Sequence, residues 1–225
     1  MQRGGEQHIP RPPGWRSGGV APWSAMPDDA KRLSLDQVET ALRNHPPARR
    51  DHLAGSDARE AAVLVAMFEE AGEVRMILTK RPDTLPTHQG QIAFPGGKFD
   101  PGVDRSLVST ALREAHEEIG LDPATVRIVA ELDHIGTVVS SFAIAPFVGL
   151  LASRPRVAPA PGEVTSVFDV ALSELLHDDT WREERWDMPW VHDADMPFYE
   201  LPGETVWGAT ARIITNLLVH LTSPT

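Results

Sequence analysis

The segment at residues 113–120, Arg-Glu-Ala-His-Glu-Glu-Ile-Gly, constrains the fold of this chain more than any other. On a helix, which turns by about 100° per residue, Glu114, Glu117 and Glu118 fall within one arc of about 100°. Apolar residues occupy the adjoining arc, so we expect one edge of the helix to pack on a core beside an acidic edge. Like charges at this spacing repel each other. A fold that contains this helix therefore has to give the three carboxylates a partner.

A divalent cation is the partner that this arrangement favours, because Mg²⁺ and Mn²⁺ prefer oxygen ligands. The ordinary alternative is a solvated acidic face, which many surface helices carry. Two features favour the metal site: no Lys stands at i+4 to pair with the carboxylates, and a glycine-rich loop precedes the helix. We therefore predict that Glu114, Glu117 and Glu118 bind Mg²⁺ or Mn²⁺.

The preceding loop, Phe-Pro-Gly-Gly-Lys at residues 94–98, has the composition of an anion-binding turn. Gly96 and Gly97 lack a Cβ, so backbone amides there can approach an anion closely. Lys98 adds a positive charge suited to phosphate. Pro-Gly-Gly alone more often marks a simple turn. Followed by the acidic helix, however, the loop favours a substrate that contains phosphate.

The loop and the helix together resemble the Nudix box. From Arg113 to Leu121 the chain matches the second half of that motif, Arg-Glu-apolar-x-Glu-Glu-x-Gly-apolar, at every position. The first half departs from it, because fifteen residues separate Gly97 from Arg113, two more than the family pattern has, and no Glu stands in the loop. We expect Asp100 or Asp104 to replace that Glu as the ion-pair partner of Arg113.

Two upstream segments, residues 77–81 and 90–97, resemble the extra signature of the coenzyme A pyrophosphatase branch of this family. The spacing is kept, but Pro82 stands where Ser is expected and Pro86 where a second Arg is expected. A guanidinium suits a phosphate, whereas proline has no side-chain donor. The resemblance spans roughly residues 61–222. It implies substrate contacts from Arg81, Gly90, Gln91, Phe94, Gly96, Gly97 and Lys98.

The resemblance implies a metal-dependent diphosphate hydrolase that cleaves coenzyme A or acyl-CoA to 3′,5′-adenosine bisphosphate and 4′-phosphopantetheine or its acyl form. A first alternative is a Nudix pyrophosphatase for ADP-ribose, dinucleotides or other nucleoside diphosphate derivatives; a second is a non-catalytic ligand sensor. If the protein is a hydrolase of this family, the resemblance implies that its catalytic residues are Glu114, Glu117, Glu118 and Arg113. The general base stays open between a helix carboxylate and a later acid such as Glu163, Glu183, Glu184 or Glu204.

The order of predicted elements indicates an α/β fold. An apolar run at 61–68 and its partner at 74–81 predict a hairpin of buried strands, and helices are expected at 106–119 and 204–221. Further strands are expected at 126–132 and 142–151, while residues 167–176 and the tryptophan-rich stretch after them could be either type. Without a regular βαβ rhythm, this order favours a mixed sheet with helices on both faces. The resemblance implies a Nudix-type α/β/α sandwich.

The chain is expected to divide into three parts. Residues 1–31 are rich in Gly, Pro and Arg without apolar periodicity, which predicts a disordered or loosely attached N-terminal arm. Residues 32–60 predict a helix and a linker, with Ser34 and Gln37 in the spacing of a capping box. Residues 61–225 are expected to form the Nudix domain.

Composition excludes several classes of protein. The absence of Cys excludes disulfides and thiol chemistry and favours a cytoplasmic protein. A formal net charge of −11 argues against binding nucleic acid, and no apolar stretch is long enough for a membrane helix. We expect a small nucleotide substrate as partner, and the family resemblance adds a homodimer as an expectation.

Overall fold

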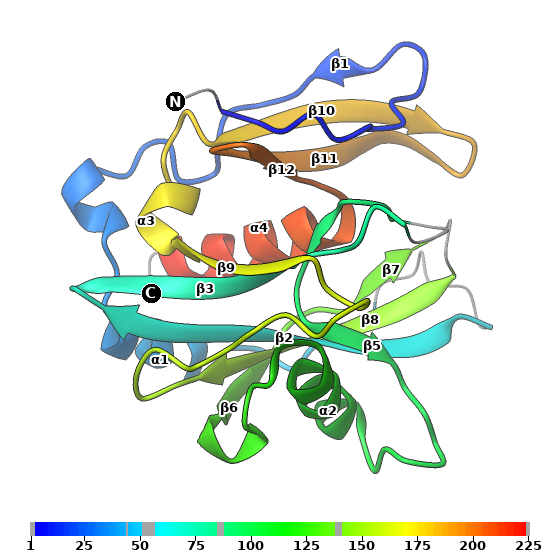
Figure 1. The fold of residues 1–225 in the computed structure, drawn as a ribbon. Helices are drawn as coiled ribbons and strands as arrows, with labels where there is room; N and C mark the ends of the chain where they lie inside the picture. Colours follow the sequence, from blue (N-terminus) through cyan, green and yellow to red (C-terminus); the bar gives the residue numbers. More distant parts are fainter. Residues whose placement is uncertain (1–2, 44, 51–56, 85–87, 138–140, 224–225) are drawn as a thin grey trace.

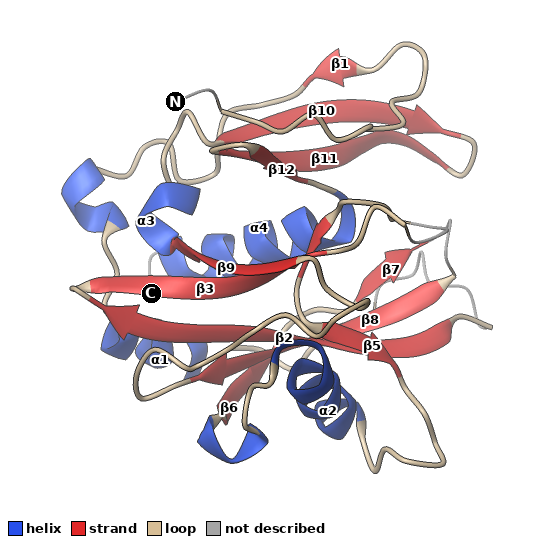
Figure 2. Ribbon diagram, in the orientation of Figure 1, coloured by secondary structure: helices blue, strands red, loops and turns tan. Residues whose placement is uncertain are grey.

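The computed structural model describes residues 3–43, 45–50, 57–84, 88–137 and 141–223. Two sheets and the helices around them make up this part of the chain (Figure 1, Figure 2). The larger sheet has the central order β4-β3-β2-β8-β6, and β5, β7 and β9 pair beside it. Its strands are β2 (Arg59–Glu70), β3 (Glu73–Lys80), β4 (Ile92–Ala93), β5 (Gly96–Lys98), β6 (Arg127–Glu131), β7 (Ile135–Thr137), β8 (Phe142–Leu150) and β9 (Ser166–Ala171).

The central strand β2 explains why this sheet is mixed. It runs parallel to β8 and antiparallel to β3 and β5. Residues 61–68 of β2 are almost entirely buried, because helices or other elements cover both faces of the sheet. The hairpin to β3 turns at Ala71 and Gly72, both with positive φ. The predicted strand pair is confirmed.

Helices lie on both faces of the large sheet (Figure 1). On one face α2 (Leu107–Ile119) packs Ala115 and Ile119 against Leu64 and Phe68 of β2. On the other face lie α1 (Leu35–Arg43) and α4 (Gly208–Thr222), which share a core with Val65 and Met67 of the same strand. Alternate residues of β2 therefore serve two cores, and the predicted α/β/α sandwich is confirmed.

The tryptophan-rich stretch forms a second sheet of four strands, which the sequence left undetermined. Its order is β1-β10-β11-β12. Trp181 and Trp186 of β10 are buried, whereas Trp190 in the following turn is exposed. The ambiguous segment before it divides into β9 and the short helix α3. The bounds are β1 (Arg16–Ser17), β10 (Trp181–Met188), β11 (Val191–Leu201), β12 (Glu204–Val206) and α3 (Leu172–Leu175).

The N-terminal arm differs from its prediction as a disordered or loosely attached segment. Its β1 pairs with β10, and Trp23 is 1% exposed, stacked on Tyr199 with ring centroids 6.5 Å apart. The guanidinium of Arg3 donates to Glu174 at 2.6 Å. Single anchoring side chains, rather than a periodic apolar face, hold this segment. They leave no regular pattern in the sequence, which is why its composition resembled that of a loose arm.

Two helix starts can be compared with their predictions. The capping box before α1 is present, because Ser34 N donates to Gln37 Oε1 at 2.8 Å and Gln37 N donates to Ser34 Oγ at 3.2 Å. The closing helix begins at Gly208 rather than at residue 204, so its predicted start was wrong. Residues 204–206 instead extend the second sheet as β12, whose pairing with β11 offers more backbone hydrogen bonds than a frayed helical turn.

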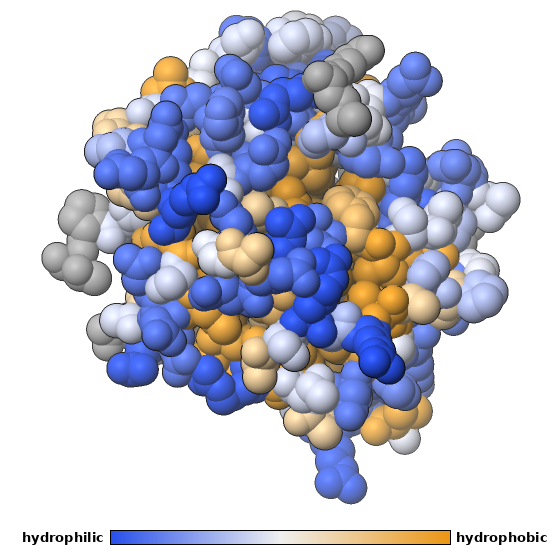
Figure 3. Space-filling view, turned by 60° about the vertical axis from the view of Figure 1, so that its left-hand side comes forward, coloured by the Kyte–Doolittle hydropathy of each residue, from blue (hydrophilic) through white to orange (hydrophobic). Residues whose placement is uncertain are grey.

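Within the residues that the structure describes, no helix is both long and apolar enough to span a membrane. On the face drawn in Figure 3, hydrophilic residues alternate with separate hydrophobic patches. Large apolar side chains that are exposed include Trp15 and Val20 in the N-terminal arm.

Candidate active site

The helix α2 is fixed at both ends and along one edge. Ser106 caps its start by accepting from Ser109 N at 3.3 Å, and Gly120 ends it with φ 69°. Thr110, Ala111 and Ala115 are buried against the sheet. This packing fixes the direction of the adjoining acidic edge, so the predicted helix is confirmed and its carboxylates face β5.

The two glycines of β5 allow close approach between that strand and its neighbours. A Cβ at Gly97 would collide with the carboxylate of Glu114, and a Cβ at Gly96 would collide with the backbone of Ala62 in β2. The amide of Gly96 donates to Glu118 Oε2 at 3.2 Å. The glycines therefore bring the strand against the helix carboxylates, and in this structure the Gly96 amide binds Glu118 rather than an anion.

Arg113 lies at the centre of an ion-pair network on α2. Its Nε and Nη2 donate to the two carboxylate oxygens of Asp104, both at 2.9 Å. The guanidinium also lies 2.9 Å from Glu114 and 2.7 Å from Glu117. Asp104 is buried and additionally accepts from Thr110 at 3.0 Å. Of the two candidates to replace the family's loop Glu, Asp104 therefore pairs with Arg113.

The pKa values of these carboxyls show what the network does. The hydrogen bonds from Arg113 lower the pKa of Asp104 from 3.8 to about 2. Burial raises the pKa of Glu114, against the opposing charge of Arg113. Burial also raises the pKa of Glu118, to about 7, and the nearby charge of Glu114 adds to this. Negative charge on Glu114 and Glu118 is thus unfavourable when protein groups alone surround these two carboxyls.

The acidic edge fits a hard divalent cation. Among the described residues no three acidic or His side chains already stand in a metal-binding arrangement, because Arg113 holds Glu114 and Glu117 while Glu118 faces Gly96. Yet the donor set is all oxygen, and a cation would relieve the unfavourable charge of the two partly buried carboxyls of Glu114 and Glu118. Glu114 and Glu118 therefore fit such an ion best, with Glu117, half-exposed, at the rim.

The predicted substrate contacts divide into three places. Lys98 is exposed and lines a cavity of about 380 Å³ beside Arg113, Glu114 and Glu117. Gly90 and Gln91 line another cavity, of about 830 Å³, together with residues of the N-terminal arm. Phe94 is 4% exposed and belongs to the hydrophobic core, and its contact with substrate stays a prediction.

Arg81, just after β3, connects the upstream signature to the helix. Its charge acts on the carboxyl of Glu118, and its backbone N–H donates to Gln91 O at 3.0 Å. The Nε atom of Arg81 is buried and has no hydrogen-bond partner among the residues that the structure describes. A buried donor without a partner is costly, which favours an acceptor supplied from outside the chain. Pro82 is buried, and Pro86 lies outside the described residues.

The loop acid Glu163 lies near the helix carboxylates, unlike the other acids considered as general bases. Its charge acts on Glu118. Its loop is fastened to the end of α2, where Ala160 N donates to Glu118 O at 2.8 Å and Ala158 N donates to Ile119 O at 3.0 Å.

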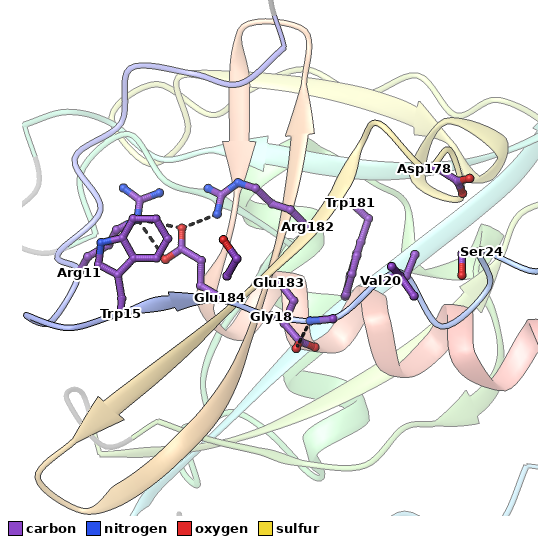
Figure 4. A pocket seen from close by; sticks show the side chains of 13 residues that line it. Arg11, Trp15, Gly18, Val20, Ser24, Asp178, Trp181, Arg182, Glu183 and Glu184 are labelled. Carbon is purple, nitrogen blue, oxygen red and sulfur yellow. Dashed lines mark hydrogen bonds and ion pairs between the residues drawn. The ribbon is translucent and has the colours of Figure 1, made fainter.

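Glu183, Glu184 and Glu204 belong to the second sheet and are already paired. Figure 4 shows Glu184 between the guanidinium groups of Arg11 and Arg182, and Glu183 beside the backbone of the arm. Glu204 pairs with Lys80 at 2.6 Å. Glu163 is therefore the later acid that the fold brings to the helix.

A comparison with known families decides the assignment. A family model described as the NUDIX domain matches residues 58–191. The chain belongs to the Nudix family. The Nudix segment thus includes the large sheet, α2 and the β10 strand, while the arm, β11, β12 and α4 lie outside the matched residues.

Curated Nudix relatives extend the similarity. An uncharacterized Nudix hydrolase named NudL from Pectobacterium atrosepticum is 35% identical over 203 residues, which cover 87% of this chain and 98% of that protein. Nudix hydrolase 22, chloroplastic, from Arabidopsis thaliana is 39% identical over 169 residues, which cover 69% of this chain. The matched part spans about half of that plant protein, 53% of its length.

A solved Nudix structure supports the fold. A MutT/nudix family protein from Enterococcus faecalis has a TM-score of 0.51 and 13% sequence identity, covering 84% of this chain and 71% of that one. His116, on the far side of α2 from Glu114 and Glu118, is exposed. What the sequence missed was the contribution of the arm, which reaches the cavity beside Gln91.

Proposed function

We propose that this protein is a metal-dependent hydrolase of diphosphate bonds in nucleotide derivatives. The observation that carries the proposal is the approach of β5 to α2, where Gly97 and Gly96 contact the carboxylates of Glu114 and Glu118. Those two carboxyls are partly buried and have raised pKa values, so they favour a cation. A cation held there would lie beside the cavity of about 380 Å³ that Glu114 and Lys98 line, where a diphosphate could bind.

Glu114 and Glu118, with Glu117 at the rim, would hold one or more Mg²⁺ or Mn²⁺ ions. When bound, such an ion supplies positive charge to the diphosphate oxygens and makes water more acidic. Arg113 positions Glu114 and Glu117, and Asp104 fixes Arg113 in turn. Arg81 and Lys98 would pair with phosphate oxygens on either side of β5.

Glu163 would accept the proton of the attacking water. It is exposed at the end of a loop tied to α2, so a water molecule can reach it. Its charge also acts on Glu118, which places it near the cation that this residue would bind. A carboxylate on a loop can turn toward the substrate without disturbing the packed helix.

Coenzyme A or acyl-CoA is the substrate class that we propose, with 3′,5′-adenosine bisphosphate and 4′-phosphopantetheine, or its acyl form, as products. The support is the signature at residues 77–81 and 90–97, whose Arg81 and Gln91 lie next to each other in the fold. The alternative is ADP-ribose, dinucleotides or other nucleoside diphosphate derivatives, because Pro86 replaces an Arg of that signature. The sensor alternative is disfavoured, since all three helix carboxylates are retained.

Product analysis tests this function. Purified protein would be incubated with Mg²⁺ or Mn²⁺ and equal amounts of coenzyme A, 3′-dephospho-coenzyme A, ADP-ribose and NADH, with products separated by chromatography and identified by mass spectrometry. Preferential release of 3′,5′-adenosine bisphosphate is expected. Preference for a substrate without the 3′-phosphate would move the specificity to the alternative, and cleavage of none would favour the sensor. A cytoplasmic location and a homodimer stay predictions beside this proposal.

A further inference from the structure

A cavity of about 830 Å³ lies between the N-terminal arm, the segment after β3 and the turn from β11 to β12. Its volume is in the range of small-molecule sites, about 300–1,000 Å³. The Nudix signature contributes Gly90 and Gln91 to its wall, and the arm contributes the opposite wall. The described residues that line it are Gly4, Gly5, Glu6, Gln7, His8, Pro10, Lys80, Asp83, His88, Gln89, Gly90, Gln91, Gly203 and Glu204.

The arm's side of this cavity is held in place by hydrogen bonds to the β11–β12 hairpin. Gln7 Nε2 donates to Glu204 Oε2 at 2.5 Å, and Thr205 N donates to Gln7 Oε1 at 3.1 Å. Gly5 N donates to Thr205 Oγ1 at 2.9 Å, and Gly4 N donates to Leu201 O at 2.8 Å. The wall is therefore formed before any ligand arrives, so binding needs little further ordering of the chain.

The end of β3 links this cavity to the helix carboxylates. Lys80 is the last residue of β3 and Arg81 follows it directly. Lys80 points into the cavity region and pairs with Glu204 at 2.6 Å, while the charge of Arg81 acts on Glu118. Gln91, whose O accepts from Arg81 N, borders the same cavity. A substrate whose diphosphate lies near Glu118 could therefore extend its other group past Gln91 into this cavity.

Charge and composition indicate which group the cavity accepts. Its lining includes the carboxylates of Glu6, Asp83 and Glu204 against the single ammonium of Lys80, a formal charge of −2 with His neutral. That charge opposes a phosphate. No Phe, Tyr or Trp is among the described lining residues, whose aromatic rings are the imidazoles of His8 and His88. Because the carboxylates oppose a phosphate, the groups that suit a neutral ligand are these imidazoles, the carboxamides of Gln7 and Gln91, and backbone amides and carbonyls.

We infer that this cavity binds the uncharged, amide-bearing or hydroxyl-bearing part of the substrate that extends beyond the diphosphate, and that the N-terminal arm is a specificity element of the enzyme. The inference rests on the proposed function, since it assumes a diphosphate held at α2. Pantetheine has the required chemistry: a neutral chain with two amides and hydroxyl groups.

The test uses the full chain without added metal and follows backbone amide signals by nuclear magnetic resonance. Pantetheine is expected to shift the signals of Gly4, Gly5 and Gln7, whereas 3′,5′-adenosine bisphosphate leaves them in place. Gln7→Ala, which removes the carboxamide from the wall, should weaken pantetheine binding by about tenfold or more. Arg16→Ala is the matched control, because Arg16 is in the same arm but outside the cavity lining. It should bind as the wild type does.

A second variant tests the same wall of the cavity in case Gln7→Ala does not fold. His8→Trp changes an exposed position of the wall to a bulky residue, and it should also weaken pantetheine binding. Unmoved amide signals in the wild type, or unchanged affinity in both variants, would overturn the inference. Because binding is measured without turnover, the two proposals fail separately. Hydrolysis of coenzyme A without pantetheine at these amides refutes only the arm's role, and binding without hydrolysis of any diphosphate refutes only the proposed function.

Discussion

At the scale of single residues, the acidic edge of α2 is a set of charges that the protein only partly compensates. Arg113 is held by the buried carboxylate of Asp104, and through it Glu114 and Glu117 are oriented. The hydrogen-bond donor that the described residues give Glu118 is the Gly96 amide, at 3.2 Å. The protein thus compensates the charge of Glu118 least, and a bound cation would gain the most free energy from this carboxylate.

Replacing Glu118 should separate catalysis from folding. Glu118→Gln is expected to lower kcat by at least about 100-fold, because a carboxamide gives a divalent cation a weaker ligand. The melting temperature without metal should stay the same or rise, since a buried carboxyl with a raised pKa is replaced by a neutral group. Steady-state kinetics and circular dichroism measure both. Near-normal turnover would contradict the metal site.

Glu163→Gln should lower kcat by about 100-fold or more while changing KM little, because a general base acts in the transition state rather than in substrate binding. The matched control is Glu183→Gln, an acid of β10 that contacts the arm backbone instead of the helix. The comparison uses steady-state kinetics at saturating Mg²⁺. Equal kcat values for Glu163→Gln and the wild type would exclude Glu163 as the base.

Asp104 predicts how stability depends on pH. Arg113 lowers its pKa from 3.8 to about 2, so its contribution is present above the unfolded pKa and is lost as pH falls toward the folded one. The shift corresponds to about 2 kcal/mol. Asp104→Asn should therefore be less stable than the wild type near neutral pH, with a difference that shrinks between about pH 4 and pH 2. Urea unfolding across this range measures the difference; one that does not change with pH would contradict the assignment.

At the scale of elements, local signals were enough to predict the helix and strands that carry the candidate site. The spacing of apolar residues, the cap at Ser106 and the glycine at 120 define α2 within a short stretch of chain. The apolar run of β2 was equally clear. The second sheet could not be predicted, because β10 has no simple alternation and pairs with β1, far away in the sequence.

The same difference between local signals and long-range contacts applies to the residues of the candidate site. The carboxylates of α2 came from local spacing, whereas the partner of Arg113 came from the family resemblance, which left Asp100 and Asp104 open. The motif includes Phe94, which packs in the core, and a motif alone does not show whether a residue packs or binds. The arm's wall of the cavity depends on contacts between residues 4–7 and 201–205, which no local pattern reveals.

The arm should contribute to stability through Trp23. Trp23→Ala is expected to lower the free energy of unfolding by about 3–5 kcal/mol, because it removes a fully buried ring from between Tyr199 and Trp181. Trp190→Ala is the matched control: this ring is 47% exposed, so its loss should change stability by less than about 0.5 kcal/mol. Urea unfolding measures both. Equal stability of the two variants would mean that the arm is as loose as its composition suggests.

At the scale of the whole molecule, metal binding should stabilise the folded chain. An ion that binds only the native state adds about 2.7 kcal/mol when its concentration is 100 times Kd. We expect Mg²⁺ or Mn²⁺ to raise the melting temperature of the wild type and to leave that of a Glu114→Gln, Glu118→Gln double variant nearly unchanged. Thermal scans with and without EDTA measure this. The same rise in both proteins would place the ion elsewhere.

The pairing of β1 with β10 has a consequence for synthesis of the chain. Arg16 lies opposite Arg185 in that pair, so the ribosome must add some 169 residues after the arm before its partner strand exists. At about 5–20 residues per second, this takes on the order of ten to thirty seconds. Throughout that interval Trp23 remains without its native neighbours Trp181 and Tyr199, and a nascent chain stalled before residue 180 would present this ring to a chaperone.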